Sequence, residues 1–183
     1  GDNGFGPGWM FNYEIRCVDS GSMVTYVNPM GVARYLQQDA NGDFFGPSGF
    51  RGELIREPDN TLTYRNDKRT EYHFSAGSAA VLSSIEDANG NTMTLQRDAN
   101  GNLTSVTDAT NRSWAFARDQ YGHITSVTDP GGGVWRYEYG ASGNDAGLLV
   151  SVENPAGEKT RYLWTQDATG HPAIRSVIAP GGA

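Results

Sequence analysis

One short pattern recurs along this chain at nearly constant spacing, and it restricts the possible folds more than any other feature of the sequence. Each unit opens with a pair of aliphatic residues three positions apart. Five such pairs follow one another at intervals of 21, 21, 25 and 25 residues: Leu82/Ile85, Leu103/Val106, Ile124/Val127, Leu149/Val152 and Ile174/Val177. A unit of this length cannot bury its own apolar face, so a period of roughly 20 to 50 residues predicts units that stack side by side.

Each unit contains a turn signal. An Asp or Asn stands two positions after the aliphatic pair, and a Gly or Asn follows three positions later. The predicted turn residues are Asp87 and Gly90, Asp108 and Asn111, Asp129 and Gly132, and Asn154 and Gly157. Residues of these types favour turns because they tolerate positive φ or hydrogen-bond the nearby backbone.

The turn is followed by residues that alternate between large apolar and small or polar side chains. Alternate residues of a strand share one face, so this alternation predicts a half-buried strand with an aromatic column on its buried face. The column consists of Trp114, Phe116, Trp135, Tyr137, Tyr139, Tyr162 and Trp164. The unit is therefore strand, turn, strand, turn, and the fold class is all-β.

Composition agrees with one turn-rich structural domain. Of 183 residues, 37% are apolar and 24 are glycine, and the formal charge is −7 with only two lysines, Lys68 and Lys159. This balance argues against nucleic acid or an anionic membrane as a partner, and the short apolar runs predict no membrane insertion. The only cysteine, Cys17, is expected to be a buried apolar thiol. The chain opens with Gly1 rather than Met and shows no signal peptide, so we expect a processed or excised piece.

The repeat is less regular in the first part of the chain. Residues 1–13 are rich in glycine and aromatic residues, which suggests a lid or plug. Residues 1–81 are predicted to form degenerate β-hairpins after this entry segment, and residues 82–183 to form regular repeats, all within one continuous structural domain. Residues 34–38 are predicted to be a strand, because a single helical turn between two turn motifs is unfavourable.

Several of these motifs resemble the YD-repeat, or RHS-repeat, family. They are Phe5-Gly-Pro-Gly-Trp9, Asp87-Ala-Asn-Gly-Asn91, Leu103-Thr-Ser-Val-Thr-Asp108, the stretch from Asp119 to Pro130, and Arg136-Tyr-Glu-Tyr139. The resemblance implies tandem β-hairpin repeats that wind into a twisted or spiral antiparallel sheet, a partial shell or solenoid. Such sheets form the shells of RHS polymorphic toxins, of toxin-complex C components and of teneurin adhesion proteins.

The chain departs from that family in two ways. Complete shells use many more repeats, so 183 residues are not expected to close a cage. The hallmark Tyr-Asp is also replaced, by Arg97-Asp98 and Arg118-Asp119 in two units and by Tyr139-Gly140 in the next.

The residues that could carry chemistry favour structural roles. The Asp-Ala-Asn-Gly segments at 39–42, 87–90 and 98–101 place glycine fourth, whereas an EF-hand calcium loop has it sixth. The repeated aspartates could be imagined as a glycosidase pair, but catalytic carboxylates occupy unlike environments. The three histidines are far apart in sequence. We therefore predict no catalytic residue, no metal site and no cofactor.

The aromatic column leaves two interpretations open. Facing inward, it is core or the lining of a shell, which is the favoured reading because the repeat needs this burial to fold. Facing outward, it could stack on sugar rings and bind carbohydrate, with help from nearby arginines.

Three hypotheses about function follow. The leading one is a non-enzymatic structural module of a secreted bacterial RHS-type protein, forming part of a shell that encloses or presents cargo such as a toxin. The second is a self-assembling extracellular fibre or adhesin subunit joined through open β-edges. The third, a carbohydrate-active enzyme, is disfavoured. The expected partners are other YD-repeat segments or copies of the chain itself, with an enclosed toxin or a cell-surface glycan as further alternatives.

Overall fold

The structure is a computed structural model that describes residues 4–7, 9 and 11–182, and it confirms the all-β fold class. The described residues form sixteen strands, and every strand pairing among them is antiparallel. Their only helical element is a single 3-10 turn, η1, at Gly143–Asp145. In this described part of the chain, no helix has the length and apolar character needed to cross a membrane. The chain groups into two compact units, the first made of residues 1–9 and 113–183 and the second of residues 10–112.

The second unit contains ten strands. Their bounds are β1 Arg16–Asp19, β2 Met23–Val27, β3 Ala33–Gln38, β4 Phe44–Phe45, β5 Glu53–Arg56, β6 Leu62–Arg65, β7 Glu71–Phe74, β8 Ala79–Glu86, β9 Thr92–Arg97 and β10 Leu103–Thr107. Strand β3 includes the predicted strand at residues 34–38. Strand β8 is long enough to join two sets of strands, because Ala79–Val81 pair with β1 while Leu82–Glu86 pair with β7.

Strands β1–β4 and β5–β8 of this unit contribute to one core. The ring of Tyr26 on β2 lies 4.7 Å from that of Tyr64 on β6, and Arg56 on β5 forms an ion pair with Asp19 on β1. The side chains that are essentially inaccessible to solvent come from both sets of strands: Cys17, Val24, Leu36, Leu62, Phe74, Ala80 and Leu82. Removal of these side chains from water stabilises the unit through the hydrophobic effect.

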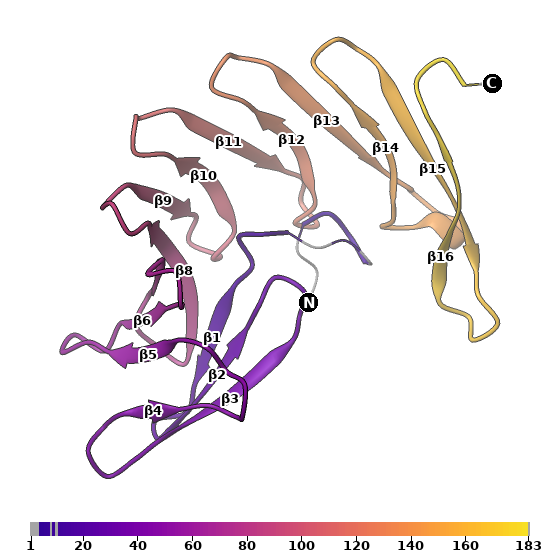
Figure 1. Ribbon diagram of the computed structural model, residues 1–183. Helices are drawn as coiled ribbons and strands as arrows, with labels where there is room; N and C mark the ends of the chain where they lie inside the picture. The colour runs from indigo at the N-terminus through magenta and orange to yellow at the C-terminus, as the bar shows by residue number, and fades with distance from the viewer. Residues whose placement is uncertain (1–3, 8, 10, 183) are drawn as a thin grey trace. The chain divides into compact units, whose positions relative to one another are not determined.

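The first unit contains a simple meander of six strands. Their bounds are β11 Ser113–Arg118, β12 Ile124–Thr128, β13 Val134–Tyr139, β14 Leu149–Glu153, β15 Lys159–Gln166 and β16 Pro172–Ile178. Each strand pairs with the next one in sequence (Figure 1). Residues 4–9 belong to this unit although they are far from it in sequence.

Most hairpins are closed by one kind of turn. In the turn that begins at Asp87, the amide of Gly90 donates to the carbonyl of Asp87, and the Asp87 carboxylate accepts the amides of Asn89 and Asn91. Gly90 has φ +83°, whereas Asn89 is not among the residues with positive φ. The same arrangement begins at Asn28, Asp39, Asn66, Asp98, Asp108, Asp119, Asp129, Asn154 and Asp167. One side chain thus fixes two amides that the turn would otherwise leave to water.

A β-bulge follows the first aliphatic residue of every unit. The strand register shifts between Leu103 and Ser105, and likewise after Leu82, Ile124, Leu149 and Ile174. Residues three apart on a regular strand face opposite sides, but one extra residue returns the second to the first side. The bulge therefore brings both members of each aliphatic pair onto one face.

The predicted division at residues 81 and 82 describes where the repeat becomes regular. The compact units divide between Arg112 and Ser113. This second division reflects which residues contact one another, not where the repeat becomes regular. The predicted division stays a prediction.

Candidate functional site

The structure places the aromatic column on one face of the first unit. In β11 and over Arg136–Tyr139 of β13 its residues alternate with more exposed small or charged side chains, and in β15 Tyr162 and Trp164 flank Leu163, which is 45% exposed. Phe116 lies opposite Val127 and Tyr137 opposite Val152, so the rings pack beside the aliphatic residues of the neighbouring strands. Most of the column is half-buried, whereas Trp135 remains 39% exposed. The result is a continuous apolar face, here called the aromatic face.

Residues 4–7 and 9, here called the entry segment, include two rings that lie against this aromatic face. The ring of Phe5 meets that of Tyr137 edge to face, with centroids 5.1 Å apart, and Trp9 meets Tyr162 in the same way at 5.1 Å. Edge-to-face contacts of this kind add to the stabilisation from burial. Burial raises the pKa of the Tyr137 hydroxyl, and the nearby Tyr162 adds to that rise. The entry segment therefore covers part of the face.

Backbone contacts fix where the segment lies. The carbonyl of Gly4 accepts a hydrogen bond from the amide of Ile124 and lies 3.0 Å from the hydroxyl of Tyr139, whose single proton it shares with the carbonyl of Ile124. Gly4 is buried with φ +85°, and a Cβ there would fall 2.1 Å from Nη1 of Arg118. Gly6 is equally constrained, since its Cβ would lie 2.8 Å from the carbonyl of Gly147. Only glycine fits these two approaches without strain.

A hydrogen bond that the sequence did not predict recurs in three of the four repeats with the same spacing, whereas Arg118 of the other one donates to the carbonyl of Gly122. Tyr139 donates to the carbonyl of Ile124 at 2.8 Å, Trp164 donates to that of Leu149 at 2.8 Å, and Arg97 approaches that of Leu82 at 3.4 Å. In each case the donor comes fifteen residues after the aliphatic residue at a bulge. The donors occupy the position where Tyr of the hallmark Tyr-Asp is expected.

This hydrogen bond explains why three different residue types serve at one position. A bulge interrupts the ladder of backbone hydrogen bonds, and a buried carbonyl without a donor is costly. Tyrosine, tryptophan and arginine each carry a donor at the end of a long side chain. The shared requirement is thus a distant donor rather than a phenol, and the fifteen-residue interval is the signal that could have revealed it.

The carboxylates in the turns accept hydrogen bonds from groups of the same turn. Burial alone would raise the pKa of Asp108, but hydrogen bonds from Thr110 and Arg112 hold it below its usual range. Hydrogen bonds from the side chain and amide of Asn91 likewise lower the pKa of Asp87. Glycoside hydrolysis needs one carboxyl group whose pKa is raised so that it can act as an acid. These two aspartates share one environment and one direction of shift, which does not suit that reaction.

The three histidines lie in separate places. His73 contacts Thr63 and Glu71 in the second unit, His123 stacks on Tyr139 in the first, and His171 contacts Thr169 in the last turn. Among the residues that the structure describes, no three histidine, cysteine, aspartate or glutamate side chains gather as a metal site would require. Burial raises the pKa of the Cys17 thiol to about 12, with a contribution from Asp19, so this thiol is not activated.

One cluster has the order of a catalytic triad. Thr63 Oγ1 lies 3.1 Å from Nδ1 of His73, whose Nε2 lies 3.7 Å from Glu71. Thr63 and His73 are direct cross-strand partners, and Thr63 is only 3% exposed. A nucleophile must reach its substrate, and a hydroxyl buried inside a sheet cannot. The arrangement is a cross-strand polar contact that satisfies a buried hydroxyl.

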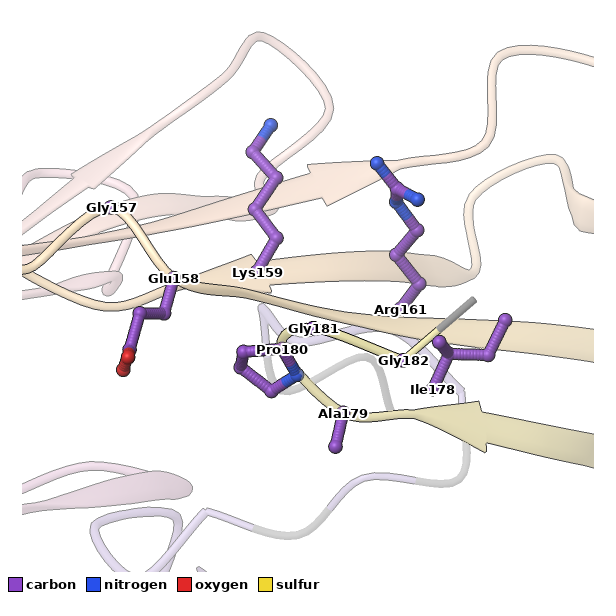
Figure 2. A pocket seen from close by; sticks show the side chains of 9 residues that line it. All are labelled: Gly157, Glu158, Lys159, Arg161, Ile178, Ala179, Pro180, Gly181 and Gly182. Atoms are coloured by element: carbon purple, nitrogen blue, oxygen red, sulfur yellow. The ribbon is translucent and has the colours of Figure 1, made fainter.

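A shallow hollow lies at the end of the first unit. It has a volume of about 430 Å³ and is bordered by Lys159, Arg161 and the turn at residues 179–182 (Figure 2). Lys159 already contacts Glu138 at 2.8 Å and Glu153 at 3.5 Å, so its charge is balanced. Comparable hollows lie beside the turns that begin at residues 66, 87 and 108. The hollow is therefore a recurring product of neighbouring turns rather than a dedicated ligand site.

Comparison with known proteins identifies the repeat. A family model described as RHS Repeat matches residues 82–113, 97–133 and 118–144 in three overlapping stretches. The first stretch contains the bulges at Leu82 and Leu103, the second those at Leu103 and Ile124, and the third that at Ile124, each with the turn that follows it. No curated protein matches the chain.

Proposed function

Because the chain belongs to the RHS-repeat family through residues 82–144, we propose that it is a non-enzymatic wall module of a secreted RHS-type protein. In this role its sheet helps to enclose or present polypeptide cargo such as a toxin. Proteins with such repeats typically act outside the cell or at its surface, which supports this location.

The aromatic face is the observation that carries the proposal. One face of the first unit is apolar and aromatic, and the other carries polar and charged groups such as Arg136, Glu138 and Lys159. A sheet of this kind separates two environments, as the wall of a container must. Trp135 offers the aromatic face an accessible ring with which to contact cargo.

The polar groups of the repeat support a structural role rather than chemistry. Carboxylates such as Asp87 fix turns, and hallmark side chains such as Tyr139 satisfy bulge carbonyls. These polar groups form hydrogen bonds within the fold, whereas a catalytic group must be free to contact a substrate.

Binding of probes to the purified chain would test this proposal. The probe for cargo is reduced, carboxymethylated α-lactalbumin, an unfolded polypeptide, and the probe for glycans is a set of soluble oligosaccharides. We expect the polypeptide to bind and Trp135→Ala to weaken that binding about tenfold, within the range for loss of an exposed aromatic contact. Arg136→Ala, on the opposite face of the same strand, is the matched control and should leave binding unchanged.

The other outcomes discriminate between functions. Oligosaccharide binding that depends on Trp135, without polypeptide binding, would replace the wall module by a carbohydrate-binding adhesin. Hydrolysis of the oligosaccharides would contradict the non-enzymatic role. Binding of neither probe would overturn the assignment of cargo to the aromatic face.

A further inference from the structure

Strand β3, in the second unit, is paired along one side but only at one end of the other. On the first side, Ala33–Gln37 pair with Met23–Val27 of β2. On the second side, β4 pairs with Gln37 and Gln38 alone. Among the residues that the structure describes, the outer edge of Ala33–Leu36 therefore carries no strand, although β2 and β4 are both in place.

Pro47 explains why β4 stops there. Phe45 lies opposite Gln37, and the next hydrogen-bonded position in that register would set Pro47 opposite Tyr35. Proline has no backbone N–H, so it cannot donate to the carbonyl of Tyr35. The chain turns instead, and the amide of Phe50 donates to the carbonyl of Pro47 at 2.9 Å. The gap beside β3 is thus a consequence of the sequence of this hairpin.

The hydrogen bonds of β3 show which backbone groups face the gap. The amide of Gln38 donates to the carbonyl of Ser22, on the β2 side. Hydrogen-bonded positions alternate along an antiparallel strand, so Ala33 and Tyr35 direct their N–H and C=O groups to the outer side. The carbonyl of Ala33 accepts Nη1 of Arg34 at 3.1 Å, which places the guanidinium at this edge.

A hollow with a volume of about 320 Å³ lies along the edge. Residues 33–35 border it on one side and residues 47–49 on the other. The second border is anchored by Phe50, whose ring centroid lies 6.5 Å from that of Tyr26 and 5.6 Å from that of Tyr64. Because this wall is fixed by the core, a ligand would need to order little of the loop.

The side chains at the edge define the chemistry of a ligand. Arg34 is exposed, and no described carboxylate forms an ion pair with it, whereas Arg56 and Arg65 of the same unit are paired. A guanidinium with unused donors binds a carboxylate through strong charge-assisted hydrogen bonds. Tyr35 is 64% exposed and, as the next residue of the strand, points to the opposite face. A ligand that contacts both side chains must therefore alternate between the two faces, as an extended peptide does.

We propose that the edge of β3 beside Pro47 is an acceptor site for β-strand addition, and that its occupant is an extended peptide in which an acidic residue stands between apolar residues. The acidic side chain lies beside Arg34, and its apolar neighbours lie on the other face beside Tyr35. Backbone hydrogen bonds supply affinity, and the alternate side chains supply specificity. The site lies in the second unit and goes beyond the proposed function, which concerns the aromatic face of the first.

A model peptide provides the probe. Its sequence is acetyl-Thr-Val-Glu-Val-Thr-amide with a fluorescent label, and the matched control has lysine in place of glutamate. We expect the glutamate peptide to bind the full chain at least tenfold more tightly than the lysine peptide, which is the effect of one hydrogen bond between charged groups. We also expect it to slow hydrogen exchange at the amide of Tyr35, which faces the gap.

Charge reversal locates the contact. Arg34→Glu should reverse the preference, so that the lysine peptide binds more tightly than the glutamate peptide. Arg16→Glu is the matched control, because Arg16 is an exposed arginine of the same sheet on a strand that is paired on both sides. This variant should keep the original preference. Circular dichroism of both variants confirms that the strands are retained.

The other outcomes overturn the proposal. Equal binding of the two peptides would remove the role of Arg34, and binding without slower exchange at Tyr35 would place the peptide elsewhere. Absence of binding to a folded chain would show that Arg34 and Pro47 protect the edge from added strands, as charged residues and prolines do at sheet edges. Trp135→Ala should leave the peptide preference unchanged, so this test and that of the proposed function can fail separately.

Discussion

The two units bury the same kind of apolar strand face in two different ways. In the second unit, strands β1–β4 and β5–β8 share a core in which Leu62, Phe74 and Leu82 are exposed by 1% or less. In the first unit, Phe5 and Trp9 of the entry segment lie on the aromatic face, where Tyr137 and Tyr162 stay half-buried. The repeat thus supplies an apolar face but does not determine what covers it. In the first unit, where only a short segment covers the face, large aromatic rings provide contact area. In the second unit, packing between the two sets of strands provides it.

Truncation of one phenylalanine in each unit should give the largest contrast. Phe74→Ala removes a ring from a closed core and should lower the free energy of unfolding by about 3 to 5 kcal/mol. Phe116→Ala removes a half-buried ring and should cost roughly 2 kcal/mol, in proportion to the smaller buried area. Urea denaturation measures both, and because all four tryptophans lie in the first unit, their fluorescence reports on that unit. Equal losses in the free energy of unfolding would mean that the two apolar faces are buried equally well.

The ion pair between Asp19 and Arg56 lies in the second unit. Nη2 of Arg56 donates to Asp19 at 2.9 Å, and this hydrogen bond, together with the amide of Gly21, holds the pKa of Asp19 below its ordinary value despite partial burial. Asp19→Asn should cost about 1 to 3 kcal/mol, the effect of removing the charged partner of a hydrogen bond.

The pH dependence of that pair follows from the direction of the shift. A carboxyl group with a lowered folded-state pKa contributes stability that is complete above its ordinary pKa, near ~3.9, and is lost as the pH falls through the folded-state value. The wild-type chain should therefore lose this contribution below about pH 4, and Asp19→Asn should not. Acid titration followed by tyrosine fluorescence compares the two, and parallel curves would show that the pair contributes nothing.

Gly4→Ala tests the thin cover of the first unit. The substitution forces a Cβ toward Arg118 in a backbone conformation that costs about 1 to 2 kcal/mol for other residues. We expect residues 4–9 to leave the aromatic face, with a red shift of tryptophan emission and loss of hydrogen-exchange protection at Ile124. Pro7→Ala, at an exposed position of the same segment, is the control. An unchanged Ile124 amide would show that Gly4 does not hold the segment.

The turns should show the smallest effect and no difference between the units. Gly90 and Gly132 have φ near +84° and open space where a Cβ would be, so alanine should cost about 1 kcal/mol at either site. Gly132→Asn should be nearly neutral, because Asn111 occupies the equivalent position with φ +63°. Thermal denaturation of the three variants checks this, and unequal alanine costs would mean that the turns depend on their unit.

The fold class could be predicted from sequence because its signals are local. Turn residues and alternating strand residues act within a few positions, so Asp87 and Gly90 mark a turn before any partner is known. The bulges leave a local sequence signal as well. Leu103 and Val106 are three apart, which a regular strand would place on opposite faces, and a serine lies between them in every unit at Ser84, Ser105, Ser126, Ser151 and Ser176.

The layered core of the second unit could not be predicted in the same way. It depends on β8 pairing with β1 through Ala79–Val81 and with β7 beyond them, and those partners are up to about sixty residues away in sequence. No local periodicity records such a pairing. The same holds for the contact of Phe5 with Tyr137, although the density of aromatic residues at the start of the chain did indicate a covering segment.

The fifteen residues between the bulge and the hydrogen-bond donor form a part of the repeat with constant length, and the residues after the donor form a part with variable length. The constant part is the same in units of 21 and of 25 residues, from Leu82 to Arg97, Ile124 to Tyr139 and Leu149 to Trp164. The additional length falls after the donor, in the loop that contains η1 or in the longer β15–β16 hairpin. Insertions at this edge of the sheet are therefore tolerated, and it offers a place where foreign peptides could be displayed without disturbing the frame.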